Sequence, residues 1–425
     1  MEGVVLEGSA KLVRLSLKLQ SLKLLWALKV QPVPARQPKI SKVKEVSLDS
    51  RHLDLGKQLE NLMTLSEHMV LQALKEAVDP NTGQTFESSK SIKNVRVIGA
   101  DVSLDVVLNY PAQSQWPIMR QGLIDKVQEL PGVKQVSIHM STQIVAHAAQ
   151  RGVQLLPQVK NIIAVASGKG GVGKSTTAVN LALALAKEGA RVGLLDADIY
   201  GPSQPMMMGL SARPQSEDGK TMEPLENHGV QVMSIGFLVA QDEAMIWRGP
   251  MATQALEQLI RQTHWKDLDY LLVDMPPGTG DIQLTLSQRV PLTGAVIVTT
   301  PQDIALLDAR KGIKMFEKVG VPILGVVENM AVHVCSQCGH QEHIFGQDGG
   351  QLMAQELSMD YLGAMPLDIH IRQQADSGRP SVVAEPEGAV AQMYLAMARA
   401  LAIKVAAKAK DFSSLFPSIK ISKDT

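Results

Sequence analysis

Short and nearly continuous apolar runs alternate with helix-like stretches after residue 161. Strands that are apolar on both faces and separated by helices are typical of a parallel sheet covered on each side. The pattern predicts strands at Ile162–Ala166, Val192–Leu195, Tyr270–Val273, Ala295–Val298 and Ile323–Val327, and helices at Ser175–Lys187 and Ile304–Val319. Ligands of such α/β folds collect at the carboxyl ends of the strands. The residues that follow each strand are therefore the first candidates for a site.

A smaller pattern precedes this one, over residues 63–142. Apolar residues at helical spacing predict a helix over Ser66–Val78, which turn residues then close. The pattern further predicts strands at Ile92–Ile98, Val102–Tyr110 and Val133–Met140, and a helix at Pro117–Leu130. We expect a small α+β domain here, a linker over 143–160, an α/β domain over 161–410 and a tail over 411–425.

The first 62 residues differ in composition from the rest. They carry 11 Lys and Arg against 6 Asp and Glu, whereas the whole chain balances 42 against 42. Charged residues interrupt the leucine-rich stretch Leu12–Val30, so it lacks the run of about 18 apolar residues that spans a bilayer. A transit peptide is one interpretation of this start, although Glu2 and Glu7 disfavour it. We favour a basic extension, disordered or translated from a misplaced start codon.

The remaining composition is that of a soluble globular protein. Hydrophobic residues make up 45 % and charged residues 20 % of 425 residues, with no net charge, so no global field indicates nucleic acid as a partner. At about 150 residues per domain, the length predicts two to three domains. The 2 cysteines exclude a disulfide framework and fit a reducing, cytoplasmic environment.

The turn after the first strand of the α/β part carries a phosphate-binding motif. Its residues are Gly168, Lys169, Gly170, Gly171, Val172, Gly173, Lys174, Ser175 and Thr176, which satisfy G-x-x-x-x-G-K-[ST] between a strand and a helix. The glycines let backbone N–H groups turn toward phosphate oxygens, and the helix N-terminus adds a positive dipole. We expect Lys174 to reach the β- and γ-phosphates and Ser175 to bind Mg²⁺.

Acidic residues follow two more of the predicted strands. Asp196 and Asp198 come at the end of one strand, where a carboxylate can orient a water for attack on the γ-phosphate. Asp274 ends a Walker B-like strand and is placed to hold the water shell of Mg²⁺. Because the phosphate loop accompanies them, we favour a catalytic role over simple capping of the next helix.

The two cysteines form a C-x-x-C motif, Cys335 and Cys338, beyond the last predicted strand. A redox pair, ordinary packing, and a zinc site completed by nearby imidazoles of His333, His340 or His343 are three interpretations. The fourth is an iron-sulfur cluster shared between chains. A [4Fe–4S] cluster usually takes four thiolates, and a twofold dimer of this chain supplies that number.

Lys169, a second lysine at the start of the phosphate loop, marks a resemblance to the deviant Walker A ATPases, which include MinD, ParA, ArsA and the nitrogenase iron protein. Further motifs narrow the similarity: Asp196–Ser203, Asp274–Asp281, Thr299–Asp303, and Glu328–Met330 followed by the cysteine pair. With these motifs, residues 63–400 resemble the Mrp (ApbC-like) iron-sulfur carrier ATPases.

The resemblance implies a homodimeric ATPase that binds ATP and Mg²⁺, hydrolyses ATP slowly, receives clusters from scaffold proteins and transfers them to apoproteins. It implies that Lys169 acts across the dimer, that Asp198 helps to activate water, with a weaker case for Asp196, and that the cysteines bridge a [4Fe–4S] cluster. Asn329 is expected to contact the adenine, with Pro366 and Asp368 lining the base pocket. The small domain resembles an iron-sulfur assembly domain but has no cysteine, so we expect it to dock partners.

Two alternatives belong to other classes. A MinD- or ParA-like positioning ATPase is supported by the stretch 389–410, which can form an amphipathic membrane helix, although packing on the sheet is the interpretation we favour. A zinc-stabilised nucleotide-binding regulator is the other. Neither nucleic acid nor stable membrane insertion is expected.

Overall fold

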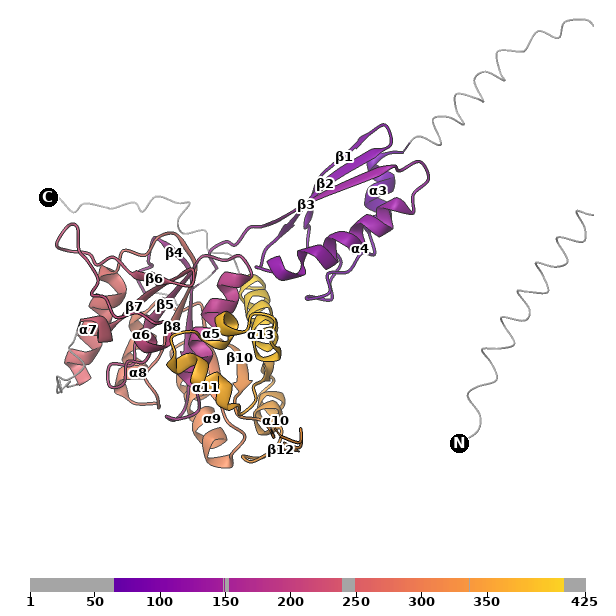
Figure 1. Cartoon of the computed structure of the whole chain (residues 1–425). Coiled ribbons are helices and arrows are strands. Elements are labelled where there is room, and N and C mark those ends of the chain that lie inside the picture. The colour runs from indigo at the N-terminus through magenta and orange to yellow at the C-terminus, as the bar shows by residue number, and fades with distance from the viewer. Residues whose placement is uncertain (1–64, 148, 150–152, 239–248, 336, 409–425) are drawn as a thin grey trace, which may run out of the picture. The chain divides into compact units, whose positions relative to one another are not determined.

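The computed structural model describes residues 65–147, 149, 153–238, 249–335 and 337–408 (Figure 1). The helices and strands considered below belong to one compact unit, Met63–Thr425. The predictions for residues 1–62 and 411–425 lie outside the described residues.

The N-terminal part of this unit is a three-stranded sheet with helices on one face. Its elements are α3 (Glu67–Leu74), β1 (Ile92–Ile98), β2 (Asp101–Leu108), η1 (Gln113–Gln115), α4 (Trp116–Gln128) and β3 (Gln135–Thr142). Strand β2 lies in the centre, antiparallel to β1 and parallel to β3. The predicted α+β order is confirmed, but α3 ends before Val78, because that residue instead forms a β-bridge with Thr85.

The C-terminal part is built on an eight-stranded sheet of order β13-β10-β9-β4-β8-β5-β7-β6. The strands are β4 (Val159–Ala166), β5 (Val192–Asp196), β6 (Leu225–Asn227), β7 (Val230–Ser234), β8 (Leu268–Asp274), β9 (Gly294–Thr299), β10 (Ile323–Glu328) and β13 (Tyr361–Ala364). Neighbouring strands are parallel except for β6, which pairs antiparallel with β7. The predicted parallel α/β sheet is confirmed.

Helices cover both faces of this sheet. Contacts among helices form two groups, as expected when right-handed crossovers in opposite directions place helices on opposite faces. One group contains α5 (Lys174–Lys187), α6 (Gln204–Met207), α11 (Ile369–Asp376), α12 (Ser381–Ala384) and α13 (Ala389–Ala406); the other contains α7 (Gly249–Gln262), α8 (Asp281–Arg289), α9 (Asp303–Lys318) and α10 (Gly349–Glu356).

Helix α5 begins at the phosphate loop and lies beside α13 (Figure 1). Ten of its residues are buried, most of them Ala, Val and Leu, because the sheet covers one side and α13 the other. Among the described helices, α13 is long and apolar enough to cross a membrane by length and composition, with 44 % of it buried in the fold. Its buried side chains include Tyr394, Leu401 and Val405, so packing on the body of the protein, the favoured interpretation, is confirmed.

Candidate nucleotide site and cysteine hairpin

The phosphate loop connects β4 to α5, and its glycines meet two steric demands. Gly171 and Gly173 both have φ of +82°, a left-handed conformation that side chains disfavour. A Cβ atom at Gly173 would also lie 2.1 Å from the Nδ2 atom of Asn329. A cavity of about 330 Å³ opens over the loop, lined in part by Lys174, Ser175 and Asp198. The open loop, its lysine and its hydroxyl fit a nucleotide with its Mg²⁺.

Gly168 packs against a helix at the start of the same loop. A Cβ atom there would lie 2.1 Å from the carbonyl carbon of Asp308, in the backbone of α9. The next residue, Lys169, is half-buried, and its carbonyl oxygen accepts a 2.8 Å hydrogen bond from the Ser167 hydroxyl. The Lys169 backbone therefore lies at the phosphate loop, as the sequence predicts.

Lys174 and the predicted carboxylates meet at the ends of the strands. Asp196 on β5 is the register partner of Asp274 on the adjacent, parallel β8, so both side chains lie at the same edge. The Lys174 Nζ atom is 2.5 Å from Asp274 Oδ1 and 3.9 Å from Asp198 Oδ2. Nζ also donates a 3.2 Å hydrogen bond to the Ser175 hydroxyl. Lys174 and Asp274 are 6 % and 0 % exposed, so their ion pair is shielded from water.

The two carboxylates after β5 have different surroundings. Asp196 is fully buried and accepts hydrogen bonds from the backbone of Asp198 (3.2 Å) and Gln204 (3.1 Å) and from the Ser234 hydroxyl (3.1 Å). Burial, followed by the charge of Asp274, raises the pKa of Asp196 above its usual range. Asp198 lines the cavity, and burial raises its pKa while Lys174 opposes the rise. Asp196 thus holds the loop, whereas Asp198 faces the cavity.

Gln204, which the sequence analysis missed, joins the three nucleotide motifs. It is fully buried at the start of α6. Its side-chain amide donates hydrogen bonds to Asp274 Oδ2 (2.8 Å) and to the carbonyl oxygen of Ser175 (3.1 Å). In the sequence, Gln204 stands out only as a polar residue at the start of a helix that follows a strand-end aspartate. Capping of that helix explains such a residue equally well.

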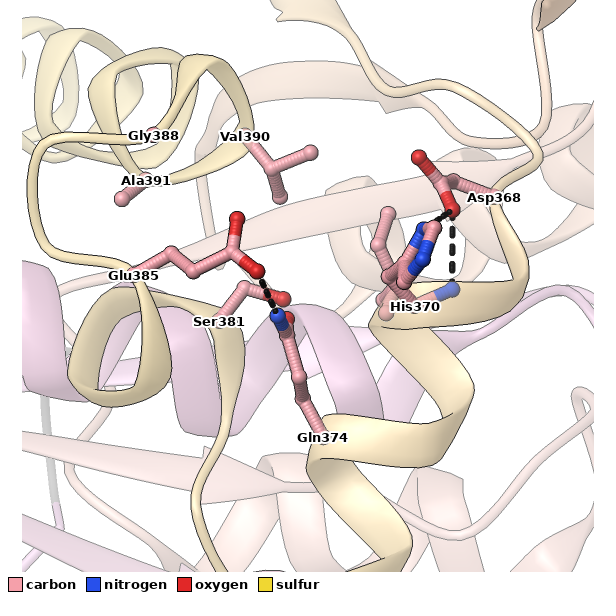
Figure 2. Close-up of a pocket in the computed structure, with 9 residues that line it drawn as sticks. Asp368, His370, Gln374, Ser381, Glu385, Gly388, Val390 and Ala391 are labelled. Carbon is pink, nitrogen blue, oxygen red and sulfur yellow. Dashed lines mark hydrogen bonds and ion pairs between the residues drawn. The ribbon is translucent and has the colours of Figure 1, made fainter. Parts of the chain in front are cut away.

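The residues expected to contact the adenine base of the nucleotide lie in two places. The Asn329 side chain follows β10 and donates a 2.9 Å hydrogen bond to the carbonyl oxygen of Val172, in the phosphate loop. Asp368 lines a separate cavity of about 130 Å³ between α11 and the start of α13 (Figure 2). Its carboxylate accepts a 2.8 Å hydrogen bond from the His370 backbone. The hydroxyl of Ser381, also in the lining, is buried and has no hydrogen-bond partner among the described residues.

The cysteine pair lies on a small hairpin beyond β10. Strands β11 (His333–Val334) and β12 (Gln341–Glu342) pair antiparallel, and the backbone N–H of Cys335 donates a 2.9 Å hydrogen bond to the carbonyl oxygen of His340. Both thiols are free, with Cys335 half-buried and Cys338 exposed. Hydrogen bonds from the backbone N–H groups of Cys338 and Gln337 lower the pKa of Cys335, which favours the thiolate that binds metal.

The neighbouring imidazoles turn toward backbone oxygens. His333 Nδ1 lies 3.1 Å from the carbonyl oxygen of Leu367, and His343 Nδ1 lies 2.8 Å from that of Ala331. Within the described part of the chain, no group of three or more His, Cys, Asp and Glu side chains is placed to hold a metal ion. The single-chain zinc set considered from the sequence is therefore not assembled there.

The parallel sheet and its phosphate loop define a P-loop NTPase. A family model described as "NUBPL iron-transfer P-loop NTPase" matches residues 158–402, and one described as "Iron-sulfur cluster assembly protein" matches residues 67–139. The chain belongs to the NUBPL iron-transfer P-loop NTPase family, which confirms the resemblance predicted from the motifs.

Named relatives agree with this assignment. An iron-sulfur cluster carrier protein of Pseudomonas fragi is 58 % identical over 64 % of this chain and 96 % of its own length. One of Salmonella typhimurium is 49 % identical over 80 % of this chain and 91 % of its own. The iron-sulfur cluster transfer protein NUBPL of Mus musculus is 55 % identical over 56 % of this chain and 76 % of its own length.

Proposed function

We propose that this protein is an ATP-hydrolysing carrier that binds an iron-sulfur cluster between two copies of the chain and transfers it to apoproteins. One observation carries the proposal. Asn329, bonded to the phosphate loop, and His333, which begins the cysteine hairpin, are separated by three residues. A change at the phosphate loop therefore has a short covalent route to the thiols.

Two thiolates from each chain complete the proposed cluster site. A [4Fe–4S] cluster usually takes four thiolates, and an isologous twofold contact brings the same surface of both copies together. The exposed Cys338 and the lowered pKa of Cys335 support such a site. The same dimer would let Lys169 reach the nucleotide of the partner, as the family resemblance implies.

The nucleotide chemistry is assigned to the phosphate loop and to residues around the cavity that opens over it. Gly168, Gly170, Gly171, Val172, Gly173 and Thr176 form the loop that cradles the phosphates, and Lys174 contacts their outer oxygens. Mg²⁺, when bound with ATP, neutralises phosphate charge, with Ser175 and Asp274 as its holders. Asp198 orients the attacking water, and Asn329, which is bonded to the phosphate loop, contacts the base. We infer slow hydrolysis, as expected of a switch.

The partners follow from the chemistry of a labile cluster. Scaffold proteins supply it and apoproteins with free thiols receive it, in the reducing cytoplasm. The loop 110–116 of the small α+β region holds no cysteine, so we assign this region to partner docking. A dimer interface that depends on the nucleotide would then couple ATP to cluster release.

Anaerobic reconstitution with iron and sulfide tests the proposal. The wild type, Cys335→Ala/Cys338→Ala and a matched control, His340→Ala, are compared by visible absorbance, bound iron, sulfide and zinc, and mass in solution. We expect a brown dimer with about four irons per two chains, retained in His340→Ala and lost in the double variant. A colourless protein holding about one zinc per chain would contradict the carrier function.

A further inference from the structure

Gln204 contacts all three motifs of the nucleotide site. Its backbone N–H donates a 3.1 Å hydrogen bond to Asp196 Oδ2, its side-chain Nε2 donates one of 3.1 Å to the Ser175 carbonyl oxygen, and the same Nε2 donates one of 2.8 Å to Asp274 Oδ2. The residue is fully buried, so water does not compete for these bonds. The side chain of Gln204 therefore ties the phosphate loop to the end of β8, and its backbone N–H ties the start of α6 to Asp196 at the end of β5.

The two oxygens of Asp274 have different donors. Lys174 Nζ lies 2.5 Å from Oδ1, and Gln204 Nε2 lies 2.8 Å from Oδ2. Donors on separate oxygens fix the rotation of the carboxylate about its Cβ–Cγ bond. When Lys174 turns to the phosphates, as its place in the loop implies, Gln204 still holds Oδ2. The plane of the carboxylate then depends on Gln204.

The orientation of the amide is dictated by its neighbours. A reversed amide would aim Oε1 at a carboxylate and a carbonyl oxygen, which both carry negative charge and accept hydrogen bonds only. The Oε1 atom is buried and has no hydrogen-bond partner among the described residues. The amide nitrogen, which donates to two acceptors, is thus the atom through which the side chain holds its neighbours.

We propose that Gln204 is a positioning residue that keeps the Asp274 carboxylate oriented for Mg²⁺ and so determines the Mg²⁺-dependent part of nucleotide affinity. The inference rests on the proposed nucleotide function and adds a residue to it. Gln204 does not contact the nucleotide in this assignment, because it acts through Asp274. Its loss should therefore affect the nucleotide with Mg²⁺ and spare the nucleotide without it.

The test measures the affinity for a fluorescent, non-hydrolysable ATP analogue by titration, once with Mg²⁺ and once with EDTA. Gln204→Met keeps the length of the side chain and removes its donor, and Gln204→Asn is too short to reach Asp274. The matched control is Gln283→Met on α8. Gln283 is 2 % exposed, and neither its amide nitrogen nor its amide oxygen has a hydrogen-bond partner among the described residues. Melting curves establish that each variant is folded.

We expect Gln204→Met to lose at least about tenfold in affinity with Mg²⁺, because a hydrogen bond to a charged group is removed. The loss in EDTA should stay within about twofold. Gln204→Asn should show the same pattern, and Gln283→Met should match the wild type. Equal losses in both conditions, or none in either, would overturn the role of Gln204. A wild type that binds the analogue in neither condition would instead refute the proposed nucleotide function.

Discussion

Lys174 stabilises the fold as well as the proposed phosphate site. Its ammonium group is paired with Asp274 and lies 3.9 Å from Asp198, at an edge that also holds the buried Asp196. Replacing Lys174 with methionine keeps much of the volume but leaves three carboxylates without their cation. We therefore predict that Lys174→Met lowers the stability of the protein before any nucleotide is added.

The magnitude follows from the burial of the pair. Removing one partner of a buried ion pair costs about 3–5 kcal/mol, because the other charge stays buried and uncompensated. For a domain of roughly 250 residues, about 2 °C of melting temperature corresponds to each kcal/mol, so the loss is about 6–10 °C. Lys174→Met/Asp274→Asn, which removes both charges, should recover most of it.

The pH dependence gives a second signature. Burial raises the pKa values of Asp196 and Asp198, and the charge of Lys174 opposes both rises. Without the lysine, these carboxyls bind protons still more tightly in the folded state than in the unfolded chain. Stability then falls as pH rises, so the deficit of Lys174→Met should grow between about pH 5 and about pH 8.

Urea unfolding without nucleotide, followed by circular dichroism across this pH range, measures the deficit. The wild type and Lys174→Met/Asp274→Asn are the references. A single variant as stable as the wild type at neutral pH, or a deficit that does not change with pH, would refute the reasoning.

Two further substitutions test other contacts. Gly168→Ala would bring a Cβ within 2.1 Å of the Asp308 backbone; we expect a loss of about 1–3 kcal/mol in urea unfolding from overpacking and weaker nucleotide binding, and an unchanged midpoint would contradict the close packing. Glu328 is buried and its pKa is raised from 4.5, chiefly by burial, so its contribution to stability falls as pH rises above that value. Glu328→Gln should therefore gain stability relative to the wild type with rising pH. A difference in free energy of unfolding that stays constant with pH would contradict the raised pKa of Glu328.

The sequence predicted elements best where burial is complete. Strands β8 and β9 are buried at every residue, and their continuous apolar runs identified them. Strand β13 has four residues, none of them fully buried, so no such run marked it. The phosphate loop could be predicted because its chemistry is contiguous along the chain.

Contacts between distant segments could not be predicted in this way. Gln204 and Asp274 are 70 residues apart, and they meet because β5 and β8 are adjacent in the sheet. Gly168 resembles any other glycine of the loop until α9 is placed against it. Strand order and helix placement are properties of the whole fold, which no local pattern specifies.

The position of α13 has a consequence for biosynthesis. This helix covers the outer face of α5, yet it ends about 220 residues after α5 does. At bacterial or eukaryotic rates of roughly 5–20 residues per second, the ribosome needs roughly 10–45 s to make the intervening chain. The apolar face of the helix that begins at the phosphate loop stays uncovered for that time. In the nascent chain, α13 thus cannot cover the outer face of α5 until it has emerged from the ribosome.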